Sequence, residues 1–318
     1  MKKRVIITGA TGFVGANLTR RLLLEGHDVH VFVRSGYTHW RIADISHQLQ
    51  LHEIELHDAR RLEQIVGEIK PHWIFHLAVY GAYSSQIDFD RMLQTNLMGT
   101  INLVRSCLKS GFEAFVNTGS SSEYGYKDHP PSENAWLEPN SHYAVTKASA
   151  TLFCRYTARH EGAHLPTLRL YSVYGPYEEP TRLIPTLILE GLKGGLPPLV
   201  NPDIARDFVY VEDVVDAYLR AVTIPDQEPG AVYNVGTGIQ MSLKDVVTIV
   251  RKIMSISATP MWGTMPNRHW DTTAWVADNR KINKVLGWQA SYTFEQGFFR
   301  MLEWFRKNPD IWFLNNKT

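Results

Sequence analysis

The chain has 318 residues, of which 44% are hydrophobic and 20% charged, a composition typical of globular proteins. Its formal net charge is +1, so no strong overall field favours nucleic acid or an anionic membrane as a partner. The two cysteines, Cys107 and Cys154, do not suggest a disulfide framework, and no uninterrupted apolar run reaches membrane-spanning length. We therefore expect a cytoplasmic protein that binds neither nucleic acid nor a membrane.

Strands and helices are predicted to alternate over the first half of the chain. The predicted strands are residues 5–8, 29–33, 73–78, 114–118 and 166–171, with a further strand-like stretch before Glu55. The predicted helices are residues 16–25, 60–69, 91–109 and 143–160. Such alternation predicts an α/β fold with a doubly wound parallel sheet, covered by helices on both faces.

The second half of the chain has a different composition and shorter predicted elements. Proline and glycine cluster over residues 175–202, and later come a strand and helix at 208–221, a short strand at 232–235 and a helix at 243–254. We expect residues 1–174 to form the first lobe, with 206–230 returning to it through the strand at 208–211. Residues 175–205 and 231–318 are expected to form a smaller second lobe, whose irregular loops and short elements suit the binding of a substrate.

A glycine-rich turn follows the first predicted strand directly. Glycines at three-residue spacing let the backbone turn tightly and approach a pyrophosphate, while the amides at the start of the next helix point at the anion. The spacing is G-x-x-G-x-x-G, and an ordinary strand-to-helix turn could also carry it. Its place at the first strand-to-helix junction favours a dinucleotide site and makes the first lobe a Rossmann domain. The expected contacts are Gly9, Thr11, Gly12, Phe13, Val14 and Gly15.

The end of the second predicted strand bears on the choice of dinucleotide. A carboxylate there binds the ribose 2′-hydroxyl of NAD, but this chain has Arg34 and Ser35 instead. Arg34 could pair with a 2′-phosphate and Ser35 could add a hydrogen bond, so NADP(H) is favoured and NAD(H) remains possible. The alternative is that Arg34 is a solvated residue at the edge of the sheet.

Two further pairs of residues are expected to contact the dinucleotide. Glu55 and Leu56, after the third strand-like stretch, are candidates for the adenine edge. Leu77 and Ala78 end the strand at 73–78, at the carboxyl edge where such sheets bind ligands.

Tyr143 and Lys147 are candidates for the chemistry. Four residues apart in a predicted helix, they share one face. A free tyrosine has a pKa of about 10, and a nearby ammonium favours the phenolate and lowers that value. Two surface helix residues would show the same spacing, but this pair follows a strand and a serine cluster that begins at Ser120.

As a set, the motifs resemble the extended short-chain dehydrogenase/reductase family, which contains nucleotide-sugar epimerases, dehydratases and 4-keto-reductases. The matching stretches are ordered and cover nearly the whole chain. They are TGATGFVG at 8–15, HLA at 76–78, NLMGTINL from Asn96, GSSSEYG at 119–125, YAVTK at 143–147, LRLYSVYGP at 168–176, RDFVYVEDV at 206–214, YNVGTG at 233–238 and LGW at 286–288.

The resemblance implies roles for individual residues. Tyr143 would be the acid/base on the sugar, Lys147 would bind the nicotinamide ribose, and Ser120 would hydrogen-bond the reacting oxygen, with Ser121 as its rival. The implied nicotinamide pocket and substrate contacts are Tyr171, Ser172 and Val173, with Arg206 and Arg268 as the clamp on the nucleotide diphosphate. Without the resemblance, Arg206 would be assigned a salt bridge to Asp207 or Asp213, and Arg268 a solvated loop.

The chain also departs from the family. Ser172 stands where asparagine is common, which puts the usual amide contact to the substrate phosphate in question. Dehydratases usually carry a glutamate two residues before the tyrosine of the Y-G pair, but here Ser122 holds that position and Glu123 follows it. We therefore predict that the protein is not a 4,6-dehydratase and that Glu123 turns away from the sugar.

The resemblance implies hydride transfer at C4 of a nucleotide-linked hexose. Reduction of a 4-keto-hexose is the first expectation, an epimerase with tightly bound NAD is the alternative, and a non-catalytic nucleotide-binding scaffold is a third. Family members commonly pair through a four-helix bundle, so a homodimer through residues 91–109 and 143–160 is expected. The 13 histidines show no zinc-site spacing, and no metal is expected.

Overall fold

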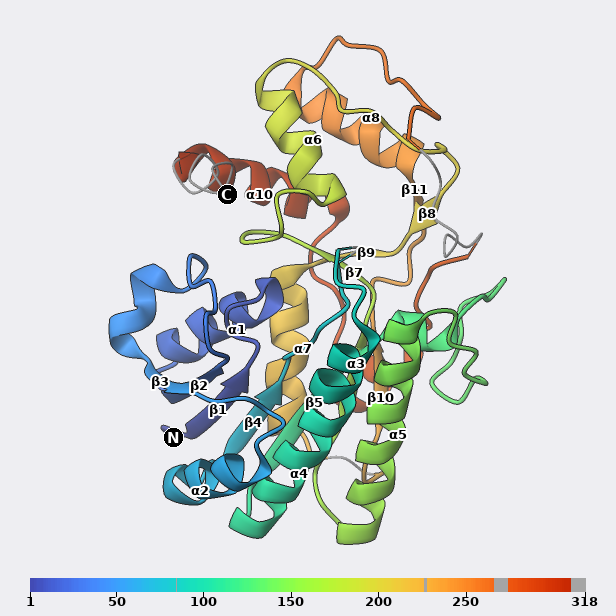
Figure 1. Ribbon diagram of the computed structural model, residues 1–318. Coiled ribbons are helices and arrows are strands. Elements are labelled where there is room, and N and C mark those ends of the chain that lie inside the picture. Colours follow the sequence, from blue (N-terminus) through green and yellow to red (C-terminus); the bar gives the residue numbers. More distant parts are fainter. Residues whose placement is uncertain (84, 226–227, 266–273, 310–318) are drawn as a thin grey trace.

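Seven strands form a single parallel sheet in the computed structural model, which describes residues 1–83, 85–225, 228–265 and 274–309 (Figure 1). Their spatial order is β10-β6-β5-β4-β1-β2-β3, and every pairing is parallel. The strands are β1 (Arg4–Thr8), β2 (Asp28–Val33), β3 (Gln50–Glu53), β4 (Trp73–His76), β5 (Ala114–Ser120), β6 (Thr167–Leu170) and β10 (Val232–Val235). The strand order reverses between β1 and β4, where sheets of this type bind their ligands. The prediction of a doubly wound parallel sheet is confirmed.

Helices cover both faces of this sheet. Side chains of β1 alternate between the two layers: Val5 and Ile7 pack into one core, whereas Ile6 packs into the other. The first layer contains α1 (Phe13–Leu24), α7 (Val211–Thr223) and α9 (Arg280–Leu286), and the second contains α2 (Ala59–Ile69), α4 (Gly99–Ser110) and α5 (His142–Glu161). Two buried layers explain why the central strands β1 and β4 are largely apolar and buried.

The helix predicted at 91–109 is divided into three consecutive segments. They are α3 (Phe89–Met92), the π-helical turn η2 (Leu93–Met98) and α4. A π-helical turn inside an α-helix often marks a functional position, and this one contains the buried Asn96.

Above the carboxyl end of the sheet lies a smaller group of elements (Figure 1). Its core is aromatic and aliphatic, built around Tyr174, Phe208 and Phe298. Its elements are β7 (Ser172–Tyr174), α6 (Leu183–Leu192), β8 (Ala205–Arg206), β9 (Phe208–Tyr210), β11 (Met241–Ser242), α8 (Leu243–Met254) and α10 (Phe294–Lys307). Two short 3₁₀ helices complete the fold, η1 (Ala43–Gln48) and η3 (Ser121–Tyr124).

Two strands differ from their predicted places. The strand expected to return to the main sheet at 208–211 is β9, which pairs instead with β7 in a small separate sheet. β10, which was expected in the second lobe, is the strand that joins the main sheet beside β6. Its four residues are all buried, so it needs a partner strand and a covering helix, which β6 and α9 provide. The assignment of a cofactor to one lobe and a substrate to the other stays a prediction.

Among the described helices, none combines the length and apolar character needed to cross a bilayer.

Candidate active site

The glycine-rich turn joins β1 to α1 and leaves no room for side chains. Gly9 has a φ of +76°, and a Cβ there would lie 2.5 Å from the carbonyl carbon of Leu77. A Cβ on Gly15 would lie 2.1 Å from the Gly9 carbonyl oxygen. The turn is therefore pressed against the end of β4, and the Ala78 amide donates to the Thr8 hydroxyl at 3.1 Å.

The start of α1 fits an anion. Its N-cap is Gly12, no side chain caps it, and its first turn contains no acidic residue. The amides of Phe13 and Val14 therefore face the same direction as the positive end of the helix dipole, with no carboxylate in the way. A dinucleotide pyrophosphate suits this position.

The end of β2 brings together two of the residues assigned to the adenosine end. The Ser35 amide donates to Glu55 Oε1 at 3.2 Å. Arg34 is exposed beside them, and Leu56 is half-buried against the Gly99 position on α4. The carboxylate missing from the end of β2 is thus present nearby, supplied by the segment that follows β3.

Tyr143 lies in the first turn of α5 and Lys147 one turn further along. The helix begins there because Ser141 caps it, accepting a hydrogen bond from the Ala144 amide at 3.2 Å. Burial raises the pKa of Tyr143 to about 12, and a hydrogen bond with Ser120 and the charge of Arg182 both oppose that rise. Burial lowers the pKa of the Lys147 ammonium, an effect that the charge of Glu123 opposes.

The serine cluster is fixed by a capping box. Ser120 caps η3 and accepts from the Ser122 amide at 3.2 Å, while Glu123 accepts from the Ser120 amide at 2.8 Å. The Ser120 hydroxyl also lies 2.7 Å from that of Ser122. Ser121 is buried within the turn. Of the two rival serines, Ser120 is the one that interacts with Tyr143.

Glu123 belongs to a buried network that the sequence did not reveal. Its Oε2 accepts from Arg169 Nε at 2.8 Å, and Oε1 accepts from the Thr151 hydroxyl at 3.0 Å. Arg169 also donates to the Tyr124 hydroxyl at 2.8 Å, and that hydroxyl donates to Asn234 Oδ1 at 2.7 Å. Through these bonds the Glu123 carboxylate connects the serine loop to β6 directly and to β10 through Arg169 and Tyr124. Arg169 lies within the matched LRLYSVYGP stretch, but nothing in the sequence assigned it to Glu123.

A second buried chain of hydrogen bonds starts at His76. Burial lowers its pKa to about 3, so the ring is neutral. Nδ1 lies 2.7 Å from the Thr8 hydroxyl and Nε2 lies 2.8 Å from the Thr100 hydroxyl. Thr100 donates to the Asn96 carbonyl, so its oxygen accepts from Nε2–H and the ring accepts from Thr8. This chain connects the glycine turn to the π-helical turn.

Asn96 in turn positions the start of α5. Its amide group donates to the Tyr80 carbonyl at 2.8 Å and to the Thr146 hydroxyl at 2.9 Å, and its Oδ1 accepts from the Tyr80 amide at 2.8 Å. Thr146 donates to the Tyr143 carbonyl at 2.8 Å. His76 and Asn96 were part of the matched motifs, but no role was predicted for either.

The residues expected at the nicotinamide end lie where β6 passes into β7. Tyr171 is buried and its hydroxyl has no hydrogen-bond partner among the residues that the structure describes, while Ser172 and Val173 are half-buried. The Ser172 amide donates to the Asp207 carbonyl at 3.0 Å. A buried hydroxyl without a partner is costly, which is consistent with a ligand group completing the site.

Arg206 is half-buried above this edge of the sheet. Its guanidinium lies over the Trp275 ring at 4.9 Å and donates to the Ala205 carbonyl at 2.8 Å. Of the two carboxylates considered as its salt-bridge partners, Asp207 accepts from the Thr237, Gly238 and Ala277 amides, and Asp213 accepts from backbone amides of the segment before α10. Arg268 lies outside the described residues.

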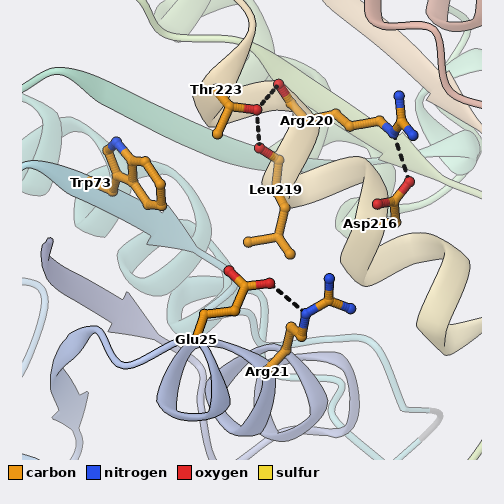
Figure 2. A pocket seen from close by; sticks show the side chains of 7 residues that line it. All are labelled: Arg21, Glu25, Trp73, Asp216, Leu219, Arg220 and Thr223. Carbon is orange, nitrogen blue, oxygen red and sulfur yellow. Dashed lines mark hydrogen bonds and ion pairs between the residues drawn. The ribbon is translucent and has the colours of Figure 1, made fainter. Parts of the chain in front are cut away.

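A hollow of about 270 Å³ lies at the amino end of β4, between α1 and α7 (Figure 2). Trp73, the first residue of β4, forms part of its wall. Its charged residues pair with one another along their own helices, Arg21 with Glu25 at 2.5 Å and Arg220 with Asp216 at 2.7 Å. The hollow thus lies at the amino end of β4, whereas the glycine turn and Ser120 lie at the carboxyl ends of β1 and β5. Because its charged residues are paired, it offers no uncompensated charge to a ligand. Within the described part of the chain, no cluster of three or more His, Cys, Asp or Glu residues could hold a metal ion.

A Rossmann sheet, a glycine-rich turn and a Tyr143–Lys147 pair beside Ser120 define an enzyme of the extended short-chain dehydrogenase/reductase class. The family model described as "NAD dependent epimerase/dehydratase family" matches residues 5–236. The chain belongs to this family, as the sequence motifs predicted.

The relatives and solved structures agree with this class. The chain is 30% identical to the UDP-glucose 4-epimerase of Mycolicibacterium smegmatis, over 95% of this chain and 98% of that protein. The UDP-glucose 4-epimerase of Thermotoga maritima, solved with UDP-glucose, superposes with a TM-score of 0.87 at 25% identity, over 96% of this chain and 100% of that one. MoeE5 in complex with UDP-glucose and NAD superposes with a TM-score of 0.83 at 30% identity, over 96% of this chain and 100% of that one.

Proposed function

We propose that the protein transfers a hydride at C4 of a nucleotide-linked hexose, with Tyr143 as the acid/base. The observation that carries this proposal is the placement of Tyr143, Ser120 and Lys147 at the carboxyl edge of the sheet, beside an uncapped helix start that fits a pyrophosphate.

In this mechanism the protein residues orient the sugar and move one proton. Ser120 hydrogen-bonds the C4 oxygen, and Tyr143 Oη takes the proton from the C4 hydroxyl or returns it to a 4-keto oxygen. Lys147 holds the nicotinamide ribose. The nicotinamide, when bound, accepts and returns the hydride. Burial raises the pKa of Tyr143 to about 12, so removal of the C4 proton by Tyr143 requires that the bound ligands favour the phenolate.

The overall reaction proposed is 4-epimerisation of a UDP-hexose. The full-length relatives support it, since the Mycolicibacterium smegmatis and Thermotoga maritima proteins are UDP-glucose 4-epimerases. In an epimerase the hydride leaves C4 and returns to its other face, so the dinucleotide stays bound throughout. A second candidate is reduction of a 4-keto-hexose by NADPH. It is favoured by Arg34, which is exposed at the end of β2 in place of a carboxylate.

The individual contacts remain part of the proposal. The glycine turn, Leu77 and Ala78 would hold the pyrophosphate, Glu55 and Leu56 the adenosine, and Tyr171 and Val173 the nicotinamide. For the nucleotide sugar we propose Arg206 as a diphosphate clamp, joined by Arg268, with Ser172 beside it.

Elimination of water from C5 and C6 is not proposed. That reaction needs a second acid/base near those carbons, and Glu123 is the nearest carboxylate in the serine loop. Glu123 is fully buried and paired with Arg169, which supports the prediction that it turns away from the sugar.

A homodimer is proposed through α4 and α5, together with the preceding π-helical turn. Exposed apolar side chains gather there: Met98, Val145, Leu152 and Tyr156 are 46%, 43%, 54% and 67% exposed. Both cysteines are buried and free, which supports the proposal of a reducing, cytoplasmic location.

The test begins with a thermal-shift screen of UDP-, GDP-, CDP- and dTDP-hexoses, because a ligand that binds only the folded state raises its stability. The best ligand is then incubated with NAD or NADPH and followed by NMR. Inversion at C4 without net consumption of dinucleotide supports the epimerase. Turnover only of a 4-keto sugar, with equal consumption of NADPH, would favour the reductase, and loss of water would contradict both.

A further inference from the structure

A strap of chain, residues 175–182, leads from β7 to α6 and passes beside the start of α1. Asn17, in the second turn of α1, ties the two together. Its amide group donates to the Pro176 carbonyl at 2.9 Å and to the Phe13 carbonyl at 3.0 Å. The strap therefore lies next to the helix turn whose free amides fit a pyrophosphate.

Arg41 makes a second and stronger connection. It is 5% exposed, and Nη2 forms an ion pair with Glu179 at 2.9 Å. Nε donates to the Tyr177 carbonyl at 2.7 Å, and Nη1 donates to the Thr11 carbonyl at 3.4 Å. A single guanidinium thus joins the strap to the glycine turn, and the segment after β2 supplies it.

The strap is also held in an unfavourable backbone conformation. Tyr177 has a φ of +69°, in the left-handed region that non-glycine residues seldom adopt. Its ring is enclosed, with the Arg20 guanidinium 4.4 Å from its centroid and the Trp304 ring 4.7 Å away. Such a conformation persists only where surrounding contacts impose it, and it is found preferentially at ligand clamps.

We infer that the Arg41–Glu179 ion pair is a latch, which holds the strap across the pyrophosphate of the bound dinucleotide and limits its release. The glycine turn and the start of α1 form one side of that site, and residues 176–179 form the other. A dinucleotide lying between them leaves only when the strap moves, which breaks the ion pair of the buried Arg41 with the half-buried Glu179, and the Asn17 contact. The latch rests on the proposed function only in that a dinucleotide binds this turn, and it is independent of the sugar reaction.

Arg41 and Glu179 are therefore positioning residues rather than catalytic ones. The latch holds the dinucleotide at its pyrophosphate, a group that NADH and NADPH share, so it should slow the release of both. A contact to the 2′-phosphate, such as that proposed for Arg34, acts on NADPH alone. Measuring both dinucleotides therefore distinguishes loss of the latch, which affects NADH and NADPH alike, from loss of a 2′-phosphate contact, which affects NADPH alone.

The experiment measures the release rate of NADH and NADPH by stopped flow, as the loss of energy transfer from tryptophan when excess oxidised dinucleotide displaces the reduced one. Glu179→Gln keeps the shape of the side chain and removes its charge. We expect release of both dinucleotides to accelerate by about tenfold, since removing the partner of a buried charge such as Arg41 acts mainly on the off-rate. Asn17→Ala removes the other tie and should accelerate release in the same direction.

The control is Glu63→Gln, which removes the exposed ion pair with Lys109 between α2 and α4 and should leave release unchanged. Circular dichroism and thermal unfolding of the dinucleotide-free variants show whether each is folded, and Arg41→Lys should restore part of the slow release relative to Arg41→Ala. Release from Glu179→Gln within twofold of the original protein contradicts the latch, as does acceleration with NADPH alone. Failure of the original protein to bind either dinucleotide would instead contradict the proposed function.

Discussion

Replacing Glu123 with glutamine probes the buried network that holds Ser120, the serine proposed to act with Tyr143. The carboxylate is 0% exposed and its partner Arg169 is 3% exposed, with Nε and Oε2 2.8 Å apart. Glutamine fills the same volume but leaves the guanidinium buried without a counter-charge. Breaking a buried ion pair in this way costs about 3–5 kcal/mol.

The substitution also weakens the hydrogen bonds that hold the serine loop in place. Glu123 accepts from the Ser120 amide at 2.8 Å and from the Thr151 hydroxyl at 3.0 Å. Both bonds end on Oε1, whereas Oε2 accepts from Arg169, so the glutamine amide must turn an N–H group toward either the serine loop or the guanidinium. We therefore expect the variant to lose turnover as well as stability, because Ser120 shifts relative to Tyr143.

The assay is equilibrium urea unfolding of the dinucleotide-free protein. Glu63→Gln is the matched control, because its ion pair with Lys109 has exposed partners and is worth about 0–1 kcal/mol. A double variant, Glu123→Gln with Arg169→Met, removes both charges and should recover part of the loss. If Glu123→Gln destabilises the protein no more than the control, the network does not hold the loop as described.

Further substitutions address the remaining residues. Tyr143→Phe should keep the fold and dinucleotide affinity but lower turnover about 100-fold or more, as measured by steady-state kinetics, and near-normal turnover would exclude it as the acid/base. Arg34→Ala should weaken NADPH binding about tenfold in a fluorescence titration and leave NADH binding unchanged; an original protein that prefers NADH would contradict the NADPH proposal. Arg206→Ala should weaken nucleotide-sugar binding in calorimetry and spare the dinucleotide, whereas equal loss of both would indicate a folding defect. Burial raises the pKa of Glu178 to about 8 from an ordinary value of 4.5, so the folded state binds the extra proton and its stability falls as pH rises between those values. Glu178→Gln should therefore become more stable relative to the original protein between about pH 5 and pH 9 in urea unfolding, and a constant difference would contradict this.

Local patterns were sufficient to predict most of the sheet. Apolar runs such as Val5–Ile7 must be buried on both faces, and the glycines after them permit only a tight turn, so β1 and the start of α1 follow from short-range chemistry. The spacing of Tyr143 and Lys147 likewise placed both on one face of a helix, one turn apart.

Long-range pairing could not be predicted in the same way. β9 and β10 are both short apolar strands, and their composition does not decide which of them joins the main sheet. Glu123 was identified from its position, but its partner Arg169 is 46 residues away in the sequence and meets it only because β5 and β6 are neighbours. The strap contacts of Arg41 depend on three loops that converge at the carboxyl edge, and no spacing rule connects them.

The central claim is that the enzyme removes and returns a hydride at C4 of a nucleotide hexose. The most direct measurement uses UDP-glucose deuterated at C4, mixed with protein loaded with NAD and quenched within a single turnover. Mass spectrometry then locates the label. The account predicts deuterium in the reduced dinucleotide, at a level that falls sharply in Tyr143→Phe. Inversion at C4 with no deuterium in the reduced dinucleotide at any time before completion, or loss of the deuterium to water, would contradict hydride transfer at C4.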